Sequence, residues 1–380
     1  MAHESQQTAL VIGGTGPTGV PLVLGLVERG AQVTMLHTGR HEDPQIPAVV
    51  EHVHADPFDI GAVQGALGAR TFDVGLIMYG RLRDLAGPIG ARVGKLITVG
   101  GAPAVRGYGD PQLLVPTGMP APTLEDAPAV DASTGEAGNE KAAKIAETEE
   151  TVLTTVATAT HFRYPLIYGP RQLLPREWLI VRRILDGRRR IIVPDAGLQL
   201  RSAAFVDNAA HAVLLAVEQP EASAGQLYHV SDSWTPTLRQ VVEIVASAVG
   251  ADIEIVSMPY ELATPSHPMT MLNGTFHRYM PSTKLAEQLG YRDVVPVADA
   301  LARTARWLVA NPHESGGTIE RNLQDHFDYP AEDALIAAWR AAVGGVAAAA
   351  DAADHVYVDR YSSDYEAARA RRRARRIAGE

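Results

Sequence analysis

The sequence predicts an α/β protein with a doubly wound parallel sheet, a smaller substrate lobe and a helical C-terminal tail. Short apolar segments rich in branched residues alternate with segments whose apolar residues recur at helical spacing. A glycine-rich turn directly follows the first apolar segment. Alternation of strand and helix implies parallel strands joined by helical crossovers, and a glycine turn suits the first crossover of a Rossmann-like sheet.

The expected elements follow in order along the chain. We expect early strands at 8–14, 31–37, 51–56, 73–79, 94–101 and 160–169, with helical segments between them that include 17–30. Proline, glycine, aspartate and serine are frequent from 102 to 138, which predicts a long loop before the helix of residues 133–150. Later we expect helices at 177–187 and 237–250, a strand leading into a helix over 203–220, and strands at 188–197, 225–232 and 251–259.

This order of elements predicts three parts. Residues 8–165 form a dinucleotide-binding domain, to which residues 200–230 return. Residues 166–199 and 231–310 form a substrate-binding lobe. Residues 311–380 form a helical extension that is rich in alanine and ends with the basic run ARARRRARR, for which a solvated or subunit-facing helix is favoured over nucleic acid.

Composition narrows the class of protein. The net charge of −10 over 380 residues argues against a nucleic-acid binder, and the absence of cysteine removes disulfides and thiolate chemistry. The first residues lack a basic segment followed by an apolar core, and no apolar run reaches the roughly 18 residues that a membrane helix needs. We therefore expect a cytoplasmic protein with a small-molecule substrate and no membrane or nucleic-acid partner; a homo-oligomer is possible.

The stretch VIGGTGPTGV carries the strongest functional signal. Gly13, Gly16 and Gly19 stand in a GxxGxxG spacing between the first strand and the first helix. The first glycine permits a tight turn, the second lets the backbone approach a pyrophosphate, and the third lets helix and strand pack closely. We expect this loop, with the residues between these glycines, to bind a dinucleotide; those residues include Thr15, Pro17 and Thr18.

The end of the second strand indicates which dinucleotide binds. An NAD site usually has an acidic residue there, which accepts hydrogen bonds from the ribose. This chain has His37 and Thr38 at that point, with Arg40 close by and no acid before Glu42. NADP is therefore favoured because Arg40 can pair with its 2′-phosphate, and NAD remains possible.

Four segments together resemble the extended and atypical short-chain dehydrogenase/reductase superfamily, which includes sugar-nucleotide epimerases and dehydratases. GGTGPTG resembles its cofactor loop, and HADPFD resembles the segment after its third strand, which implies that Asp56 contacts adenine. FRYPLIYGPRQ is similar to the strand that enters the substrate lobe, with Tyr168 and Arg171 as possible substrate contacts. RSAAFVDNAAHAV is similar to the returning segment, in which Arg201 faces a diphosphate or another anion. The resemblance covers roughly residues 8–310.

The catalytic residues of that superfamily are missing here. Its members use a tyrosine four residues before a lysine on one helix, and a serine or threonine after the fourth strand. In this chain Gly100, Gly101 and Ala102 stand where the hydroxyl is expected. Lys141 and Lys144 both remain candidates for the lysine, with Ala137 or Glu140 in place of the tyrosine.

Three other side chains are candidates for the proton donor. Glu140 lies four residues before Lys144, although a solvated Glu–Lys pair is the more ordinary interpretation. Tyr108 lies in the long loop, and Tyr79 ends a strand where ligands bind in such sheets. Tyr79 and Lys144 are also expected to contact the cofactor. No metal site is expected, because the histidines considered lack metal-like pairing with acids; these are His161, His211, His229, His267 and His277.

The favoured hypothesis is an NAD(P)-dependent oxidoreductase that acts on a small carbonyl, enone or sugar-like substrate through a relocated proton donor. One alternative is an epimerase, isomerase or dehydratase that retains its cofactor through a transient oxidation. Another is a non-catalytic dinucleotide-binding regulatory protein, suggested by the loss of both hydroxyl positions.

Overall fold

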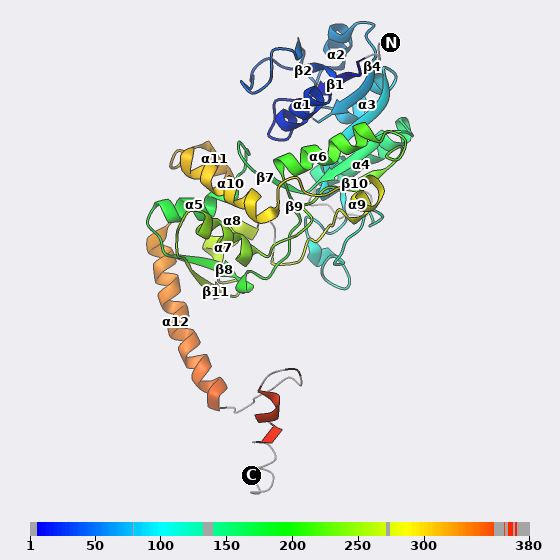
Figure 1. Ribbon diagram of the computed structural model, residues 1–380. Helices are drawn as coiled ribbons and strands as arrows, with labels where there is room; N and C mark the ends of the chain where they lie inside the picture. The colour runs from blue at the N-terminus through cyan, green and yellow to red at the C-terminus, as the bar shows by residue number, and fades with distance from the viewer. Residues whose placement is uncertain are drawn as a thin grey trace. The chain divides into compact units, whose positions relative to one another are not determined.

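The computed structural model describes residues 6–78, 80–131, 140–270, 274–352, 361, 364–367 and 369–370. The chain divides into two compact units, Met1–Phe327 and Asp328–Glu380, and each is described by itself. The first unit contains the sheet, the glycine loop and a smaller lobe, and the second contains one long helix (Figure 1).

A parallel sheet organises the first unit. In the described residues it has seven strands in the order β10-β6-β5-β4-β1-β2-β3. The chain order runs outward from β1 on one side and from β4 on the other, so the switch in connectivity lies between these two parallel strands. Ligands bind at such a reversal, beyond the carboxyl ends of the strands. The strands of the sheet are β1 (Thr8–Ile12), β2 (Gln32–His37), β3 (Glu51–His54), β4 (Phe72–Ile77), β5 (Val93–Gly101), β6 (Thr160–Tyr164) and β10 (Leu227–His229). The predicted doubly wound sheet is confirmed.

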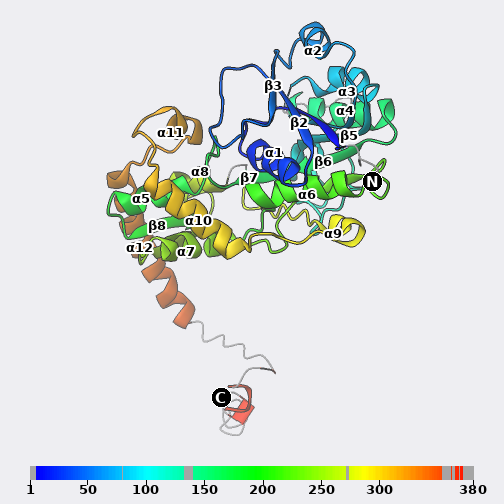
Figure 2. The same ribbon diagram turned by 45° about the horizontal axis from the view of Figure 1, so that its top comes forward.

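Helices cover both faces of this sheet (Figures 1 and 2). On one face α1 packs against α6, and on the other α3 packs against α4. Strand β1 shows the consequence for sequence: Ala9 and Val11 enter one core, while Leu10 and Ile12 enter the other. Strands buried on both faces are continuously apolar for this reason. The covering helices are α1 (Gly19–Glu28), α2 (Ile60–Leu67), α3 (Leu82–Gly90), α4 (Glu140–Thr155) and α6 (Val206–Glu218).

A smaller lobe is built around two further strand pairs, β8 with β11 and β7 with β9. Its main core joins Trp178, Val193, Val242 and Leu308 from four different elements. The strands are β7 (Leu166–Tyr168), β8 (Arg190–Pro194), β9 (Ala203–Phe205) and β11 (Glu254–Met258). The helices are α5 (Trp178–Leu185), α7 (Leu238–Ala248), α8 (His267–Thr270), α10 (Val297–Ala310) and α11 (Thr318–Leu323), whereas α9 (Thr283–Leu289) packs on α6 and β10 of the large sheet.

Two segments differ in detail from the expected elements. The single strand expected at 160–169 is divided at Pro165, so that β6 joins the large sheet and β7 pairs with β9. Proline has no N–H to donate to a ladder, which explains the division. The start of the predicted extension at 311 also falls within the first unit, because Trp178 Nε1 on α5 donates to Glu320 Oε1 on α11 at 3.0 Å.

The second unit contains the long helix α12 (Tyr329–Ala352), so the expected helical C-terminal region is present. The sequence suggested no segment long and apolar enough to cross a membrane. Among the described helices, α12 reaches that length and composition because its alanines continue the helix over 24 residues. One such helix is weak evidence for a membrane span, and the absence of a membrane partner stays a prediction. Most of the basic run lies outside the described residues.

Candidate functional site

The glycine loop has the geometry that its spacing predicts. Gly13 ends the first strand with φ of +93°, a conformation that favours glycine. A Cβ on Gly19 would lie 2.7 Å from the backbone of Gly14, whereas a Cβ on Gly16 would meet nothing within 4 Å. Gly19 therefore permits close packing, and Gly16 leaves open space where a phosphate can approach. The Thr18 side chain makes no cap hydrogen bond to α1, and the N–H groups of Gly19 and Val20 donate to the Gly16 carbonyl at 2.9 and 3.1 Å. The positive end of the α1 dipole favours a phosphate beside this loop.

The predicted adenosine contacts lie at the ends of β2 and β3. His37 is buried as the last residue of β2, and its Nε2 lies 2.9 Å from Nδ1 of His52. Arg40 is exposed in the following loop, and Asp56 is exposed just after β3. Burial, followed by the neighbouring His52 and His54, lowers the pKa of His37. The contacts of His37, Arg40 and Asp56 with a cofactor stay predictions.

Packing restricts which residue can stand at position 100, near the end of β5. A Cβ on Gly100 would lie 2.5 Å from Nε2 of His161, so a serine does not fit there without displacing that ring. Thr98, the nearest hydroxyl, is buried and lies 2.7 Å from Nδ1 of the same histidine. Thr98 and His161 are therefore buried side chains of the sheet.

The two candidate lysines lie on the exposed face of α4. Lys144 Nζ lies 3.8 Å from Glu140 Oε2, and their side chains are 63% and 93% exposed. Lys141 is exposed as well, while Ala142 and Ala146 form the buried face. This is the geometry of a solvated i,i+4 pair. The catalytic roles of these residues stay predictions; Tyr79 and residues 132–139, including Ala137, lie outside the described residues.

A buried ionic network beneath α4 was not foreseen. Arg163 on β6 donates through Nη2 to Glu149 Oε1 at 2.6 Å and through Nε to Glu149 Oε2 at 2.7 Å. Its Nη1 also lies 3.1 Å from Nε2 of His229. A signal existed, since Arg163 interrupts an apolar strand and Glu149 falls on the apolar face of the helix. Burial, followed by the charge of Arg163, lowers the pKa of His161 and of His229 to about 3.

The structure brings Tyr168 and Arg201 to one small cavity in the lobe, of about 40 Å³. Tyr168 donates through its hydroxyl to Asp232 Oδ2 at 2.7 Å, and both side chains are buried. Burial raises the pKa of Asp232 to about 6. Arg171, by contrast, is exposed and pairs with Asp43, so it does not join them at this cavity.

Arginines surround Tyr108 beside that cavity. Arg278 donates through Nε to the Tyr108 carbonyl at 2.8 Å, and its guanidinium carbon lies 5.9 Å from the Tyr108 ring centroid. Burial raises the pKa of the Tyr108 phenol, while Arg201, Arg278 and Arg176 oppose that rise. Arg176 and Arg278 were missed from the sequence because they lie about a hundred residues apart and belong to no motif.

The polar atoms of this cluster are incompletely paired. Arg201 donates to the carbonyls of Met269 and Thr270 at 3.1 and 3.3 Å, and Arg176 donates to that of Pro268. Three buried atoms of this cluster have no hydrogen-bond partner among the described residues: Arg176 Nε, Arg278 Nη2 and Glu177 Oε2. Burial, followed by the charge of Arg201, lowers the pKa of Arg176 to about 10. Cations arranged in this way can bind an anion.

Comparison with known proteins identifies the family, although no family model matches the sequence. The chain is 32% identical over 261 residues to a 3-diazoavenalumate denitrifying reductase from Streptomyces sp., which covers 64% of this chain and 81% of that protein. It belongs to the extended short-chain dehydrogenase/reductase superfamily. A 2-alkyl-3-oxoalkanoate reductase from Stenotrophomonas maltophilia is 29% identical over 269 residues, 64% of this chain and 76% of that protein.

Other members of this superfamily match shorter stretches or the fold alone. A dTDP-glucose 4,6-dehydratase from Actinoplanes sp. is 32% identical over 149 residues, which is 38% of this chain and 42% of that protein. The chain thus spans less than half of that relative. A crystal structure of a Bordetella bronchiseptica enzyme, WbmH, in complex with NAD+ has a TM-score of 0.62 at 14% identity, covering 80% of this chain and 98% of that one. The superfamily's NAD(P)-binding fold is therefore present.

Proposed function

We propose that this chain is an NADP-dependent reductase of a small carbonyl or enone substrate that carries a carboxylate or a similar anionic group. The observation that carries the proposal is the arginine cluster around Tyr108. A reductase needs a dinucleotide site, a place for the substrate and a proton donor. The glycine loop supports the first. The arginine cluster supports the second, and its Arg201 also lines the cavity, together with Glu177 and Asp232.

The charge balance of the cluster favours an anionic substrate. Arg176, Arg201 and Arg278 bring three positive charges, whereas Glu177 brings one negative charge and Asp110, near Arg278, brings a second. Their guanidinium hydrogen bonds go to backbone carbonyls, which carry no net charge, so the positive charges outnumber the negative ones. Buried charge is costly unless it is paired. A substrate carboxylate would pair with it and accept charge-assisted hydrogen bonds from the free N–H groups.

The names of two relatives point to the same chemistry. One acts on a 2-alkyl-3-oxoalkanoate and the other on a 3-diazoavenalumate, and each name is that of a carboxylate. Both align with this chain over three quarters or more of their length. A 3-oxo acid or an aryl-substituted acid is therefore the first substrate class to test.

Tyr108 is the side chain we propose as the proton donor. It follows β5 on the loop and is 5% exposed, and burial raises the pKa of its phenol. When bound, the nicotinamide supplies a hydride to the substrate carbon. Tyr108 would give its phenolic proton to the substrate oxygen, and the nearby guanidinium groups would stabilise the phenolate that remains. Lys144, Lys141 and Glu140 are the alternatives that exposure on α4 makes less favourable.

NADP is the cofactor we propose, with NAD as the alternative. His37 occupies the position at the end of β2 where an acidic residue, if present, would repel a 2′-phosphate. Arg40 is exposed in the next loop and can pair with a 2′-phosphate. A cytoplasmic location, where NADPH is at hand, is part of the proposal.

The test is oxidation of NADPH, followed at the reduced-nicotinamide band, with a panel of 3-oxo acids and the corresponding methyl esters. Turnover of the acids with little turnover of the esters supports the proposal. Equal turnover of acids and esters would contradict the proposal that the substrate is anionic. If no compound of the panel is turned over while fluorescence shows that NADPH is bound, the proposed reductase activity is contradicted.

The dehydratase relative favours a second candidate, in which a retained cofactor is reduced and reoxidised within one cycle. In that case the protein would purify with nucleotide and convert a sugar nucleotide without net consumption of added cofactor. Stoichiometric oxidation of NADPH excludes this candidate. The regulatory alternative predicts cofactor binding without any turnover.

A further inference from the structure

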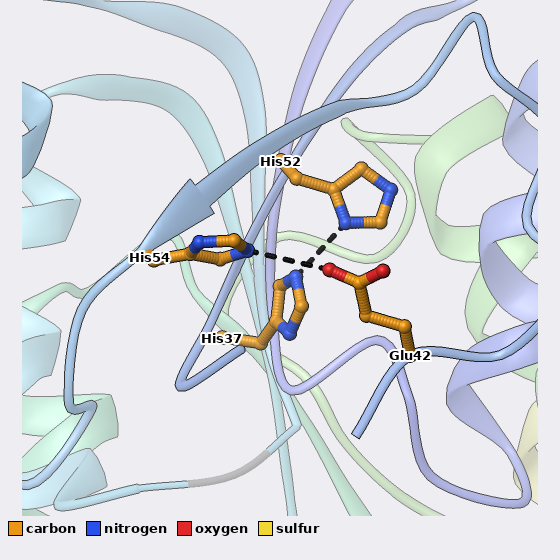
Figure 3. A group of neighbouring side chains, drawn as sticks. All are labelled: His37, Glu42, His52 and His54. Atoms are coloured by element: carbon orange, nitrogen blue, oxygen red, sulfur yellow. Dashed lines mark hydrogen bonds and ion pairs between the residues drawn. The ribbon is translucent and has the colours of Figure 1, made fainter. Parts of the chain in front are cut away.

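We propose that His37, Glu42, His52 and His54 form a binding site for a divalent transition metal of the zinc class. Figure 3 shows the four side chains converging on one point beside the ends of β2 and β3. One ligand atom from each residue lies within 4.8 Å of all the others.

Strand register brings the three histidines together. β2 and β3 are parallel neighbours in which His37 pairs with His54 and Met35 pairs with His52. Because side chains alternate along a strand, His52 and His54 point to the same face. His37 points to that face as well, since Met35, two residues before it, belongs to the core on the α1 side. Glu42 then reaches the cluster from the loop between the two strands (Figure 3).

The distances are close to those of a tetrahedral site. His37 Nε2 lies 2.9 Å from His52 Nδ1, and His54 Nε2 lies 3.6 Å from Glu42 Oε1. Bonds of about 2.0–2.1 Å to zinc place neighbouring ligand atoms about 3.3–3.4 Å apart in a tetrahedron. Both separations lie near that value. The wider separations would close by rotation of His54 and Glu42, whose side chains are 54% and 61% exposed.

The ring orientations also suit convergence on one ion. The His37 ring is inclined at 72° to that of His52 and at 89° to that of His54, with centroids 5.1 and 4.9 Å apart. Each ring turns one nitrogen toward the space beside the Glu42 carboxylate (Figure 3), and the ligand atoms lie within 4.8 Å of one another. Three imidazoles and one carboxylate are a donor set that zinc accepts.

Binding would exchange one contact for another at His37. Its Nδ1 accepts from the Gly39 N–H at 3.3 Å, and its Nε2 lies 2.9 Å from His52 Nδ1. A metal on Nε2 requires the proton on Nδ1, so the long contact with Gly39 is lost and that proton turns to water or a carbonyl. The loss is small because a bond of that length is weak.

Cobalt titration of the full-length, tag-free protein, stripped with a chelator, tests the site. Co²⁺ in a tetrahedral nitrogen and oxygen environment gives intense visible absorption, and Zn²⁺ added afterwards displaces it. We expect one Co²⁺ per chain with a tetrahedral spectrum that zinc abolishes. An octahedral spectrum, or the absence of any saturable binding, would overturn the proposal.

Variants distinguish this cluster from the other histidines of the chain. His52→Ala and Glu42→Gln leave the buried His37 in place, and each is expected to weaken Co²⁺ binding by on the order of 10-fold or more. His41→Ala is the matched control, because His41 is exposed in the same loop outside the cluster. Circular dichroism and thermal unfolding show that each variant is folded. Unchanged binding in His52→Ala, or equal weakening in His41→Ala, would show adventitious binding only.

Discussion

Arg163 on β6 and Glu149 on α4 form a buried ion pair with two parallel hydrogen bonds of 2.6 and 2.7 Å. The pair ties the helix that carries the candidate lysines to the sheet, because both partners are less than a tenth exposed. It also fixes the position of His229, which lies 3.1 Å from Arg163 Nη1. The orientation of α4 therefore depends on charge as well as on apolar packing.

Removal of one partner should destabilise the protein strongly. Glu149→Gln leaves the Arg163 charge buried without its partner, which costs about 3–5 kcal/mol in free energy of unfolding. Urea unfolding measures this loss. The exposed pair Arg70–Glu51 provides the control, since Arg70→Met should cost no more than about 1 kcal/mol. Similar losses in the two variants would contradict the assigned role of burial.

Stability should fall as the solution is acidified below pH 6.5. His161 and His229 have a pKa of about 3 when folded against 6.5 when unfolded, so their contribution is complete above pH 6.5 and is lost as pH falls toward 3. Asp232 acts in the opposite sense. Its pKa of about 6, raised from 3.8, gives a contribution that is complete below 3.8 and lost as pH rises through 6. The two histidines outweigh it because each shift is larger.

The slope of stability against pH isolates one of these histidines. Each contributes about 1.4 kcal/mol per pH unit between 6.5 and 3, so His229→Gln should flatten the slope by about that amount. Urea unfolding at pH 6.5 and 4.5 gives the two points. The exposed His326→Gln should leave the slope unchanged. A wild-type slope in His229→Gln would contradict the shift.

We expect that a hydroxyl side chain cannot be introduced at residue 100 alone without a loss of stability. Gly100→Ser places Cβ 2.5 Å from His161 Nε2, and overpacking of this kind costs about 1–3 kcal/mol. Thermal unfolding should show a lower midpoint for this variant. Gly100→Ser combined with His161→Ala should recover part of the loss, because the smaller side chain frees the space. A single variant as stable as wild type would show that His161 moves aside freely.

Tyr108 should affect turnover without affecting cofactor affinity. Tyr108→Phe removes only the phenolic oxygen, and loss of a general acid lowers kcat by about 10²–10⁴-fold. Steady-state kinetics with a turned-over 3-oxo acid and fluorescence titration with NADPH measure the two quantities. Tyr279→Phe, a partly buried tyrosine beside Arg278 in sequence, is the control. If kcat changes less than threefold in Tyr108→Phe, the proton comes from another group, and Lys144→Met and Lys141→Met become the next variants.

Local sequence rules predicted much of the cofactor half of this protein. The spacing of Gly13, Gly16 and Gly19 is a local constraint, because each glycine meets its need within a few residues. The alternation of buried strands and helices likewise gave the sheet. The division at Pro165 followed a rule that could have been applied, since proline interrupts a strand ladder.

The remainder depends on contacts between distant segments. His37 meets His52 and His54 only through the register of two strands, which a single sequence does not reveal. Arg176 and Arg278 meet Tyr108 through the folding of the smaller lobe, and neither belongs to a motif. The exposure of Lys144 was easier to predict from the sequence, because alanines on the opposite face of α4 indicated the buried side.

The proposed reductase function depends most on the arginine cluster as the site of an anionic substrate. The direct measurement is KM for a 3-oxo acid and for its methyl ester, in wild type and in Arg278→Met. We expect the substitution to raise KM for the acid by about 10- to 100-fold, since a hydrogen bond to a charged group is lost, and to leave KM for the ester nearly unchanged. An equal change for acid and ester, or none for the acid, would contradict the account.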